Sequence, residues 1–336
     1  MERKVTLAHG DGGELAHKLI QQIFISAFGN GHAARFDSAY LSLKSGEIAV
    51  TTDSFVVRPL FFPGGDIGKI AVSGTVNDLA VAGAIPLYLT AGFIIEEGFS
   101  LADLRKIVQS LAEEAGKAGV RVVAGDTKVV EKGGADGVYI NTTGVGLQRA
   151  GSSVDPSRIE AGDDIVVSGT IGDHGIAILA ARGELGLMTD LESDCASLNK
   201  MIAALIDGGC DVKMMRDPTR GGVATTLVEI AEDFGAVLEI EERTLPIRNE
   251  VKGACDILGF DPLYLANEGK VILVVSHADC PQALDILRRF PEGENTAVIG
   301  HVAGRGRGTG QLLLETPLGS KRRIHRLSGM MLPRIC

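Results

Sequence analysis

The chain has 336 residues, 45% of them apolar and 23% charged, a balance typical of globular proteins. This length predicts two domains rather than one. The net charge of −10, the absence of tryptophan and an aromatic content of 4% argue against a general nucleic-acid binder, because neither a basic surface nor a set of stacking side chains is on offer.

Neither a secretory signal nor a membrane span is expected. The opening segment MERKVTLAHGDGG has no apolar core of the kind that a signal peptide needs. The uncharged run 79–95 is shorter than the about 20 residues of a spanning helix. The five cysteines are widely spaced and form no CxxC pair, which argues against disulfides and zinc sites. We therefore expect a cytoplasmic protein with no membrane partner.

The first half of the chain is predicted to form a glycine-rich N-terminal segment with a helix (1–42), followed by an α/β domain (43–150). In that domain, apolar stretches alternate between the two periods that are typical of strands and of helices. The predicted strands are 47–53, 88–95, 120–126 and 138–148, and the predicted helices are 68–84 and 100–119. Ser100 is the expected N-cap of the second helix.

A polar, turn-rich stretch at 150–163 leads into a second α/β domain, predicted over 151–304. Its expected strands are 163–169, 236–242, 270–276 and 295–302, and its expected helices begin near Gly175 and cover 196–206 and 221–235. Residues 305–336 are predicted to form a hairpin and a mobile tail that ends in Cys336. The predicted fold class is α/β (α+β), with two mixed-sheet domains, helices packed on one face, and a flexible C-terminal tail.

Acidic residues at the ends of elements in the first domain indicate a metal site. Asp53 and Asp126 each end a predicted strand, Asp78 lies in a predicted helix, and Asp37 is a fourth candidate. Carboxylates gathered in one cleft repel one another unless a hard cation such as Mg²⁺ bridges them, and such a cation lets a polyphosphate bind among acids. The alternative for each aspartate is an ordinary cap of a helix or turn.

Three glycine-rich segments could offer backbone amides to phosphates: HGDGG (9–13), PGGDIGK (63–69) and PTRGG (218–222). None of them matches a Walker A loop, because only three residues separate Gly64 from Gly68 and Ile70 stands where a hydroxyl residue should hold the metal. No GxGxxG turn joins a first strand to a helix, which argues against a Rossmann dinucleotide site.

Taken together and in this order, the segments TTDSF, PGGDIGKIAVSGTVNDLAVAGA, AGDTKVV and DPTRGG carry a resemblance. They resemble the ATP-binding superfamily of aminoimidazole ribonucleotide synthetase, selenophosphate synthetase and thiamine-phosphate kinase, which implies a PurM-like fold over nearly the whole chain. Selenophosphate synthetases typically carry a reactive cysteine or selenocysteine near the N-terminus. The first cysteine of this chain is Cys195, which disfavours that branch. The terminal PRIC is instead similar to that of HypE-like hydrogenase maturation proteins.

The HypE-like branch implies an enzyme, an ATP-dependent carbamoyl dehydratase of the lyase class. In this branch a HypF-like carbamoyltransferase loads the terminal cysteine, and ATP then drives loss of water to leave a thiocyanate. The cyanide passes to the iron of a [NiFe]-hydrogenase on a HypC–HypD-like scaffold. The resemblance also implies a homodimer formed through the N-terminal domains, with ATP bound near their junction.

Carried onto this sequence, the resemblance assigns Asp53, Asp78 and Asp126, and with them Asp37, to Mg²⁺ and ATP. Further residues of the same motifs are implied as nucleotide contacts: Thr127, Gly64, Gly65 and Asn77. Cys336 is implied as the residue that carries the substrate group.

Two further residues are candidates for the chemistry. Lys128 lies two positions after Asp126, so on a strand both project to the same side, where Lys128 could steady a phosphate or the carboxamide oxygen. Its alternative is a solvent-facing strand lysine. Glu268 precedes an apolar strand and resembles the acidic residue of the family's active site, which suggests a proton acceptor. Its alternative is an ordinary turn carboxylate.

The second domain adds His174, Asp217 and Arg220 as candidates for lining the path of the tail. Arg220 precedes a predicted helix N-terminus, where anions bind favourably. The competing interpretation of DPTRGG is a helix-entry turn without chemistry, and that of His174 is a hydrogen-bonding residue, since no second histidine lies at ligand spacing. The remaining cysteines, Cys195, Cys210, Cys255 and Cys280, are expected to pack in the interior.

A thiol at the end of a tail suits a carrier arm, because it can leave one site and visit another, and its thiolate is a good nucleophile. Composition alone favours an incidental surface cysteine, and only the resemblance reverses that preference. Two other functions stay open. One is an ATP-dependent phosphotransferase or ligase acting on a free small molecule, and the other is a non-catalytic carrier that ATP switches between conformations.

Overall fold

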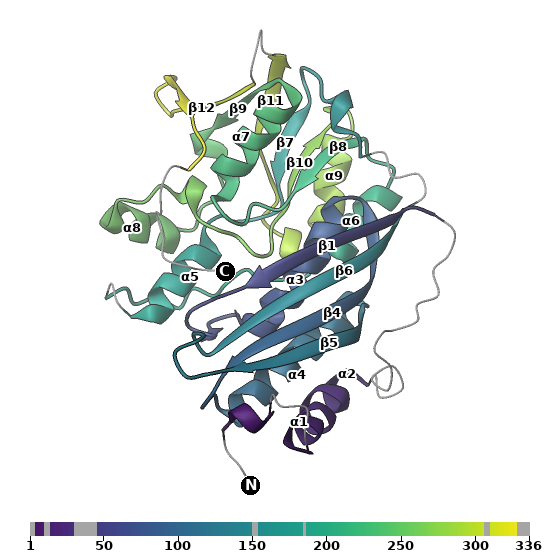
Figure 1. Ribbon diagram of the computed structural model, residues 1–336. Coiled ribbons are helices and arrows are strands. Elements are labelled where there is room, and N and C mark those ends of the chain that lie inside the picture. Colours follow the sequence, from purple (N-terminus) through teal and green to yellow (C-terminus); the bar gives the residue numbers. More distant parts are fainter. Residues whose placement is uncertain are drawn as a thin grey trace.

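The computed structural model describes residues 4–9, 14–29, 46–149, 154–183, 186–305 and 310–327. They form two α/β domains, each built on a sheet that contains both parallel and antiparallel strand pairs (Figure 1). The predicted fold class is thereby confirmed. Asp37 and Cys336 lie outside the described residues. Within the described part of the chain, no helix is both long and apolar enough to cross a membrane.

The first domain has a four-stranded sheet in the order β1-β6-β4-β5. Its strands are β1 (Ile48–Phe55), β4 (Ala84–Glu96), β5 (Arg121–Val130) and β6 (Val138–Gln148). Neighbouring strands pair antiparallel except for β4 and β5, which are parallel. Figure 1 shows helices α3 (Ile67–Val81) and α4 (Leu101–Ala118) behind this sheet, with its other face turned towards the viewer.

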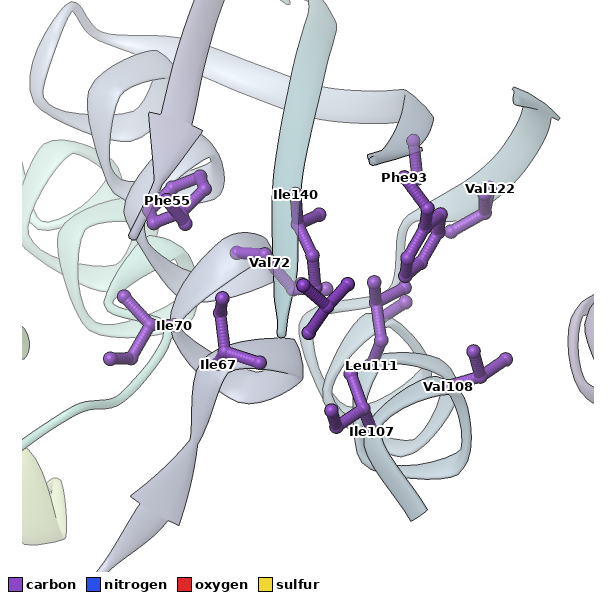
Figure 2. Packing of buried hydrophobic residues seen from close by; sticks show 14 of the residues in the cluster. Phe55, Ile67, Ile70, Val72, Phe93, Ile107, Val108, Leu111, Val122 and Ile140 are labelled. Carbon is purple, nitrogen blue, oxygen red and sulfur yellow. The ribbon is translucent and has the colours of Figure 1, made fainter. Parts of the chain in front are cut away.

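The core of the first domain lies between these two helices and the sheet. Figure 2 shows Val72 of α3 beside the inward side chain Ile140 and Leu111 of α4 beside the inward side chain Phe93, whereas Ile70 of α3 points away from both strands' side chains. All five are at most 2% exposed. Because α3 carries small and aliphatic residues over most of its length, it is buried on nearly all sides.

Both helices begin at side-chain caps. The Asp66 carboxylate accepts hydrogen bonds from the N–H groups of Gly68 and Lys69 at the start of α3. Ser100 Oγ accepts the Asp103 N–H at 3.3 Å at the start of α4, which confirms the predicted cap. Shorter elements surround the core: η1 (Leu7–His9), α1 (Glu14–Leu19), η2 (Ile20–Ile25), α2 (Ser26–Phe28), β2 (Phe61–Phe62) and β3 (Gly65–Asp66).

The second domain has a seven-stranded sheet in the order β13-β12-β9-β11-β7-β10-β8. Its strands are β7 (Asp164–Val167), β8 (Val212–Arg216), β9 (Ala236–Glu241), β10 (Ile272–Val275), β11 (Ala297–Arg305), β12 (Gln311–Glu315) and β13 (Lys321–Ile324). Its helices are α5 (Asp173–Arg182), α6 (Asn199–Asp207), α7 (Gly222–Phe234), α8 (Asn249–Leu258) and α9 (Cys280–Leu287). Single 3-10 turns link them: η4 (Pro156–Arg158), η5 (Glu242–Thr244), η6 (Pro262–Tyr264) and η7 (Pro291–Gly293).

Helices cover both faces of this second sheet, whereas one covered face was expected. Strands β7 and β10 are buried at every position. Their alternate side chains belong to two separate clusters, one shared with α7 and the other with α6 and α9. The continuous apolar runs of β7 and β10 follow from this, because a strand covered on both sides needs no polar face.

The hairpin predicted after residue 304 is present and belongs to the second domain. Strand β12 pairs antiparallel with β13 and parallel with β9, so the hairpin extends the sheet past β9. Leu312, Leu314 and Ile324 are at most 2% exposed and join the α7 side of the core.

A buried ion pair ties β8 to the start of the second domain. Lys213, with 2% exposure, donates from Nζ to Glu160 at 2.7 Å and to Asp163 at 2.8 Å. Burial alone would lower the pKa of Lys213, but the hydrogen bonds to the two carboxylates outweigh it and raise that pKa above its ordinary value. The pair keeps a charge inside the core, so removing one partner leaves the other uncompensated.

Candidate functional site

A cleft of about 690 Å³ lies at the junction of the two domains. Its walls come from β1 and α3 of the first domain and from β8 and the segment after it in the second. The charged residues that line it are Asp53, Asp78, Arg216, Asp217, Arg220 and Glu268. It therefore gathers residues that are far apart in the sequence and of both charge signs.

Asp53 and Asp78 face each other because α3 crosses β1 closely. An added Cβ at Gly74 would lie 2.9 Å from the Phe55 ring and 3.9 Å from Asp53 Oδ2, so only glycine permits this approach. Gly74 and Asp78 are one helical turn apart, which puts the Asp78 carboxylate on the same side. Thr51 donates its hydroxyl to Asp78 Oδ2 at 2.9 Å.

The pKa of Asp78 is raised, first by burial and then by the nearby Asp53 charge, although the Thr51 hydrogen bond opposes the shift. Hard oxygen ligands that repel one another fit Mg²⁺, which proteins often bind through one or two carboxylates together with substrate phosphates. Within the described residues, no group of three or more histidine, cysteine or acidic side chains could hold a metal by itself.

Arg216, Asp217 and Arg220 enter the cleft from the end of β8 and the turn before α7. Desolvation and the nearby Asp78 charge raise the pKa of Asp217 to about 7. Strand β8, and with it Arg216, was not predicted from the sequence. The short and mostly apolar run VKMM between Gly-Gly-Cys and Asp-Pro is the signal that could have revealed this strand.

Glu268 lines the same cleft although only 4% of its surface is exposed. It lies between η6 and β10, in the segment that runs alongside the turn at Pro218. It lines the same cleft as Asp78 and the two arginines, and its role as a proton acceptor is taken up below as a proposal.

Asp126 does not join Asp53 and Asp78 within one protomer. Strand β5 has a bulge next to Leu89 of β4, after which Asp126 pairs with Gly92 and Lys128 with Ile94. This register directs Asp126 and Lys128 to the open face of the sheet, where they line a separate recess of about 340 Å³. The expected cluster of three aspartates is therefore wrong for a single chain, although the shared direction of Asp126 and Lys128 is confirmed.

The distance across the sheet supports this separation. Asp126, Gly92, Asn141 and Ser54 occupy one row of paired positions over the four strands. Three strand spacings amount to about 14 Å between Asp126 and Ser54. Thr127 alternates to the side of Phe93, away from Asp126.

Gly64, Gly65 and Asn77, which are predicted nucleotide contacts, pack against the segment 193–198 of the second domain. A Cβ at Gly64, whose φ is +91°, would lie 2.6 Å from the Ser193 carbonyl oxygen, and one at Gly65 would lie 2.6 Å from Cys195 Sγ. Asn77 is 1% exposed, donates to the Ala196 carbonyl and accepts the Leu198 N–H at 2.7 Å. The lack of a side chain at the two glycines and the amide group of Asn77 serve this close packing, and a nucleotide contact of these residues stays a prediction.

His174 is completely buried in the first turn of α5 rather than on the wall of the cleft. Its Nδ1 lies 2.8 Å from Ser193 Oγ, and its ring packs edge-on against Phe62. This arrangement agrees with the alternative of a hydrogen-bonding residue. The four other cysteines, Cys195, Cys210, Cys255 and Cys280, are all buried, as expected.

The described chain ends close to the cleft. After β13, the carbonyl of His325 accepts the Tyr264 hydroxyl at 2.8 Å, and the Leu327 N–H donates to Thr225 Oγ1 at 3.3 Å. Thr225 lies in the first turn of α7 against Gly221, the residue after Arg220. The base of the C-terminal segment is therefore fixed at the rim of the cleft.

Two family descriptions cover most of the chain. The AIR synthase related protein N-terminal domain matches residues 36–148, and the C-terminal domain of the same family matches residues 160–312. Each description falls on one of the two domains of the structure.

Individual relatives match over almost their whole length. A carbamoyl dehydratase HypE of Rhodobacter capsulatus is 49% identical, covering 100% of this chain and 99% of the relative. A crystal structure of hydrogenase maturation protein HypE in complex with ATP is 45% identical with a TM-score of 0.93, covering 98% of this chain and 99% of that one. HypE in a crystal structure of a HypE–HypF complex is 48% identical with a TM-score of 0.80, covering 92% and 99%. The chain belongs to the HypE family of carbamoyl dehydratases.

Proposed function

We propose that this protein uses ATP to dehydrate an S-carbamoyl group on its own Cys336 to a thiocyanate. The observation that carries the proposal is the cleft, in which paired carboxylates, two arginines and a buried glutamate surround one space. A relative of 45% identity that forms a complex with ATP supports a nucleotide in this protein as well.

In this proposal Asp53 and Asp78 hold Mg²⁺ together with the phosphates of ATP. The metal, when bound, neutralises phosphate charge and makes the γ-phosphorus easier to attack. Arg216 and Arg220 lie in the same cleft and add donors for the phosphate oxygens. Arg220 also precedes α7, whose N-terminus favours anions.

The chemistry needs a leaving group on the carboxamide carbon. The carboxamide oxygen attacks the γ-phosphorus and ADP departs, so one nitrogen-bound proton must leave as the C=N bond forms. Loss of the second nitrogen-bound proton, with cleavage of the C–O bond to release phosphate, gives the nitrile. We assign Glu268 as the acceptor of the first proton, since a carboxylate that lines the cleft can take it directly, and the departing phosphate takes up the second.

The tail is long enough for this reaction. Nine residues, 328–336, follow Leu327. When extended, they span up to about 30 Å. Because the Leu327 N–H is hydrogen-bonded to Thr225 at the rim of the cleft, this length is enough to bring Cys336 to the cleft of its own protomer.

The intact mass of the C-terminal peptide tests the proposal. After incubation with a HypF-like carbamoyltransferase and its substrates, this peptide should gain one carbamoyl group, and addition of ATP and Mg²⁺ should then remove one water. An ATP-dependent phosphotransferase acting on a free small molecule would instead keep its turnover after deletion of 331–336. A protein that gains the carbamoyl group and never loses water contradicts the proposed function.

We also propose a homodimer formed through the open face of the first sheet. Exposed apolar side chains gather on that face, with Val50 64%, Ile48 54% and Ile94 44% exposed. Asp126 and Lys128 project from the same face. If two copies pair there, these two residues of one protomer approach the end of β1 of the other, so that they can contact phosphates across the junction.

Val50→Asp is expected to weaken this dimer at least about tenfold, because it places an unpaired carboxylate in a buried apolar contact. Sedimentation velocity over a concentration series measures the dissociation constant. Ile257→Asp is the matched control, since Ile257 is 78% exposed on α8 of the other domain and should leave the dimer intact. A wild-type protein that stays monomeric at all concentrations contradicts the proposal.

The proposed function also implies protein partners. A HypE–HypF complex of a 48% identical relative supports a HypF-like carbamoyltransferase as the enzyme that loads Cys336. We further propose a HypC–HypD-like scaffold as the cyanide acceptor and the cytoplasm as the site of the reaction, where thiols stay reduced.

A further inference from the structure

The wall behind Glu268 separates two recesses of the molecule. Glu268 itself lines the cleft between the domains, whereas Asp194 and Lys270 line a second pocket of about 820 Å³ on the other side. We infer that Asp194 is a positioning residue, which fixes the backbone of Glu268 so that its carboxylate is presented to the cleft. This inference rests on the proposed role of Glu268 and adds the residue that holds it in place.

Asp194 is almost completely removed from solvent, with 3% of its side chain exposed. Its Oδ1 accepts the backbone N–H of Glu268 at 3.0 Å, and its Oδ2 lies 3.2 Å from Lys270 Nζ. Lys270 Nζ also donates to the Gly269 carbonyl at 3.3 Å. One carboxylate thus accepts a hydrogen bond from the peptide group of Glu268 and forms an ion pair with the side chain two residues further on.

The two backbone segments touch as well. An added Cβ at Gly269 would lie 1.8 Å from the Asp194 carbonyl oxygen, a distance that no side chain allows. The Ala196 N–H donates to the Glu268 carbonyl at 3.5 Å. Both peptide groups of Glu268 are therefore held by the segment 194–196, and a larger residue at 269 would push that segment away.

Asn267 holds the same segment against the second-domain wall of the cleft. Its side chain donates to the Pro218 carbonyl at 3.0 Å and accepts the Gly172 N–H at 2.8 Å, and it is completely buried. Pro218 directly follows Asp217 of the cleft. Asp194 and Asn267 together leave Glu268 little freedom to shift relative to the phosphate-binding side.

The charge state of Asp194 suits a fixed hydrogen-bond acceptor. Burial disfavours its ionised form, but the Lys270 and His174 charges and the hydrogen bond from Glu268 outweigh burial and hold the pKa of Asp194 below its usual value. An ionised carboxylate accepts the Glu268 N–H more strongly than a neutral group does. A displacement of about 1 Å at a reacting group can cost about 10²-fold in rate, so such an anchor affects the chemistry directly.

The decisive comparison uses two double variants that both remove the buried charges. Asp194→Leu/Lys270→Met fills the space with apolar groups and loses the acceptor for the Glu268 N–H. Asp194→Asn/Lys270→Met keeps an acceptor oxygen at the same position. Removing both charges together avoids the uncompensated buried ion that a single substitution would leave.

The single-turnover rate of water loss from the carbamoylated protein should fall about 10²-fold in Asp194→Leu/Lys270→Met, here called the Leu/Met variant. Asp194→Asn/Lys270→Met is called the Asn/Met variant. The Asn/Met variant should recover most of that loss, because the hydrogen bond is restored. The affinity for ATP should be the same in both. Lys213→Met, which breaks a buried ion pair whose partners lie outside the cleft, is the control for lost stability, and it should lower the melting temperature without this loss of rate.

A cycle with Glu268→Gln separates positioning from general stability. Glu268→Gln alone should slow the reaction about 10²- to 10⁴-fold. Adding Asp194→Leu/Lys270→Met to it should cost little more, because the anchor has no effect without the group that it positions. Independent, additive losses overturn the inference, and so does a Glu268→Gln protein that reacts at the wild-type rate while the wild type still loses water.

Hydrogen exchange at the Glu268 amide gives a readout that does not depend on the reaction. This amide should be protected in the wild type and in the Asn/Met variant and should exchange faster in the Leu/Met variant. Equal protection in all three proteins overturns the inference. Failure of the wild type to lose water, with the exchange pattern as expected, overturns the proposed function and leaves the anchoring of Glu268 supported.

Discussion

Cys336→Ala is expected to abolish both the gain of the carbamoyl group and the ATP-dependent loss of water, while ATP binding is retained. In the proposed function the carbamoyl group is attached to the sulfur atom of Cys336, so without that atom the group cannot be attached. Cys336→Ser should fail as well, since a serine hydroxyl is a far weaker nucleophile than a thiolate at neutral pH.

The other cysteines are poor substitutes for physical reasons. Burial raises the pKa of Cys195 to about 11, that of Cys255 to about 11 and that of Cys280 to about 12, so almost none of them is a thiolate at pH 7. Burial also raises the pKa of Cys210. All four lie in the hydrophobic core, where a carbamoyl donor would have to enter.

Intact mass and peptide mapping after loading measure this prediction, with nucleotide affinity by calorimetry as the test of a folded protein. Cys255→Ala is the matched control, which removes a buried thiol and should load normally. Carbamoylation of the Cys336→Ala protein, at any other residue, contradicts the assignment of the terminal cysteine.

Asp78→Asn is expected to slow single-turnover loss of water by about 10²- to 10³-fold, the effect typical of removing one preorganised group that stabilises charge at the reacting centre. Asparagine keeps the size of the side chain and can still accept the Thr51 hydroxyl. The substitution therefore removes the charge and little else. Loading of Cys336 should proceed as in the wild type, because that step happens in another enzyme.

A second readout follows the metal directly. Calorimetric titration of ATP with and without Mg²⁺ should show a strong metal dependence in the wild type and a much smaller one in Asp78→Asn. Asp285→Asn, an exposed aspartate on α9, is the matched control. If Asp78→Asn leaves both the metal dependence of ATP binding and the rate unchanged, the assignment of Asp78 to the metal site is wrong.

The local order of the chain was predictable where one period dominates. The strand at 138–148 coincides with β6, and the helix predicted at 100–119 differs from α4 by one residue at each end. Both have strong alternation or an amphipathic pattern, and α4 begins at the predicted Ser100 cap. In such segments, local preference and burial in the fold agree.

The candidate site was predicted correctly only where its residues lie on elements that are neighbours in the sequence. Asp53 and Asp78 meet because a strand and the next helix pack together, which motif order already indicates. Asp126 was misplaced because the bulge that sets its face depends on pairing with β4. The packing of Gly64 and Asn77 was not predicted, because their partners come from residues 193–198, far away in the sequence.

The position of the β12–β13 hairpin has a consequence for biosynthesis. Strand β9 acquires its outer neighbour only from residues 311–315, so the second core lacks Leu312, Leu314 and Ile324 until that late part of the chain has been synthesised. Cys336 leaves the ribosome after all of them. The order of synthesis therefore ensures that the thiol becomes available for loading only after all the described strands, β1 to β13, have been synthesised.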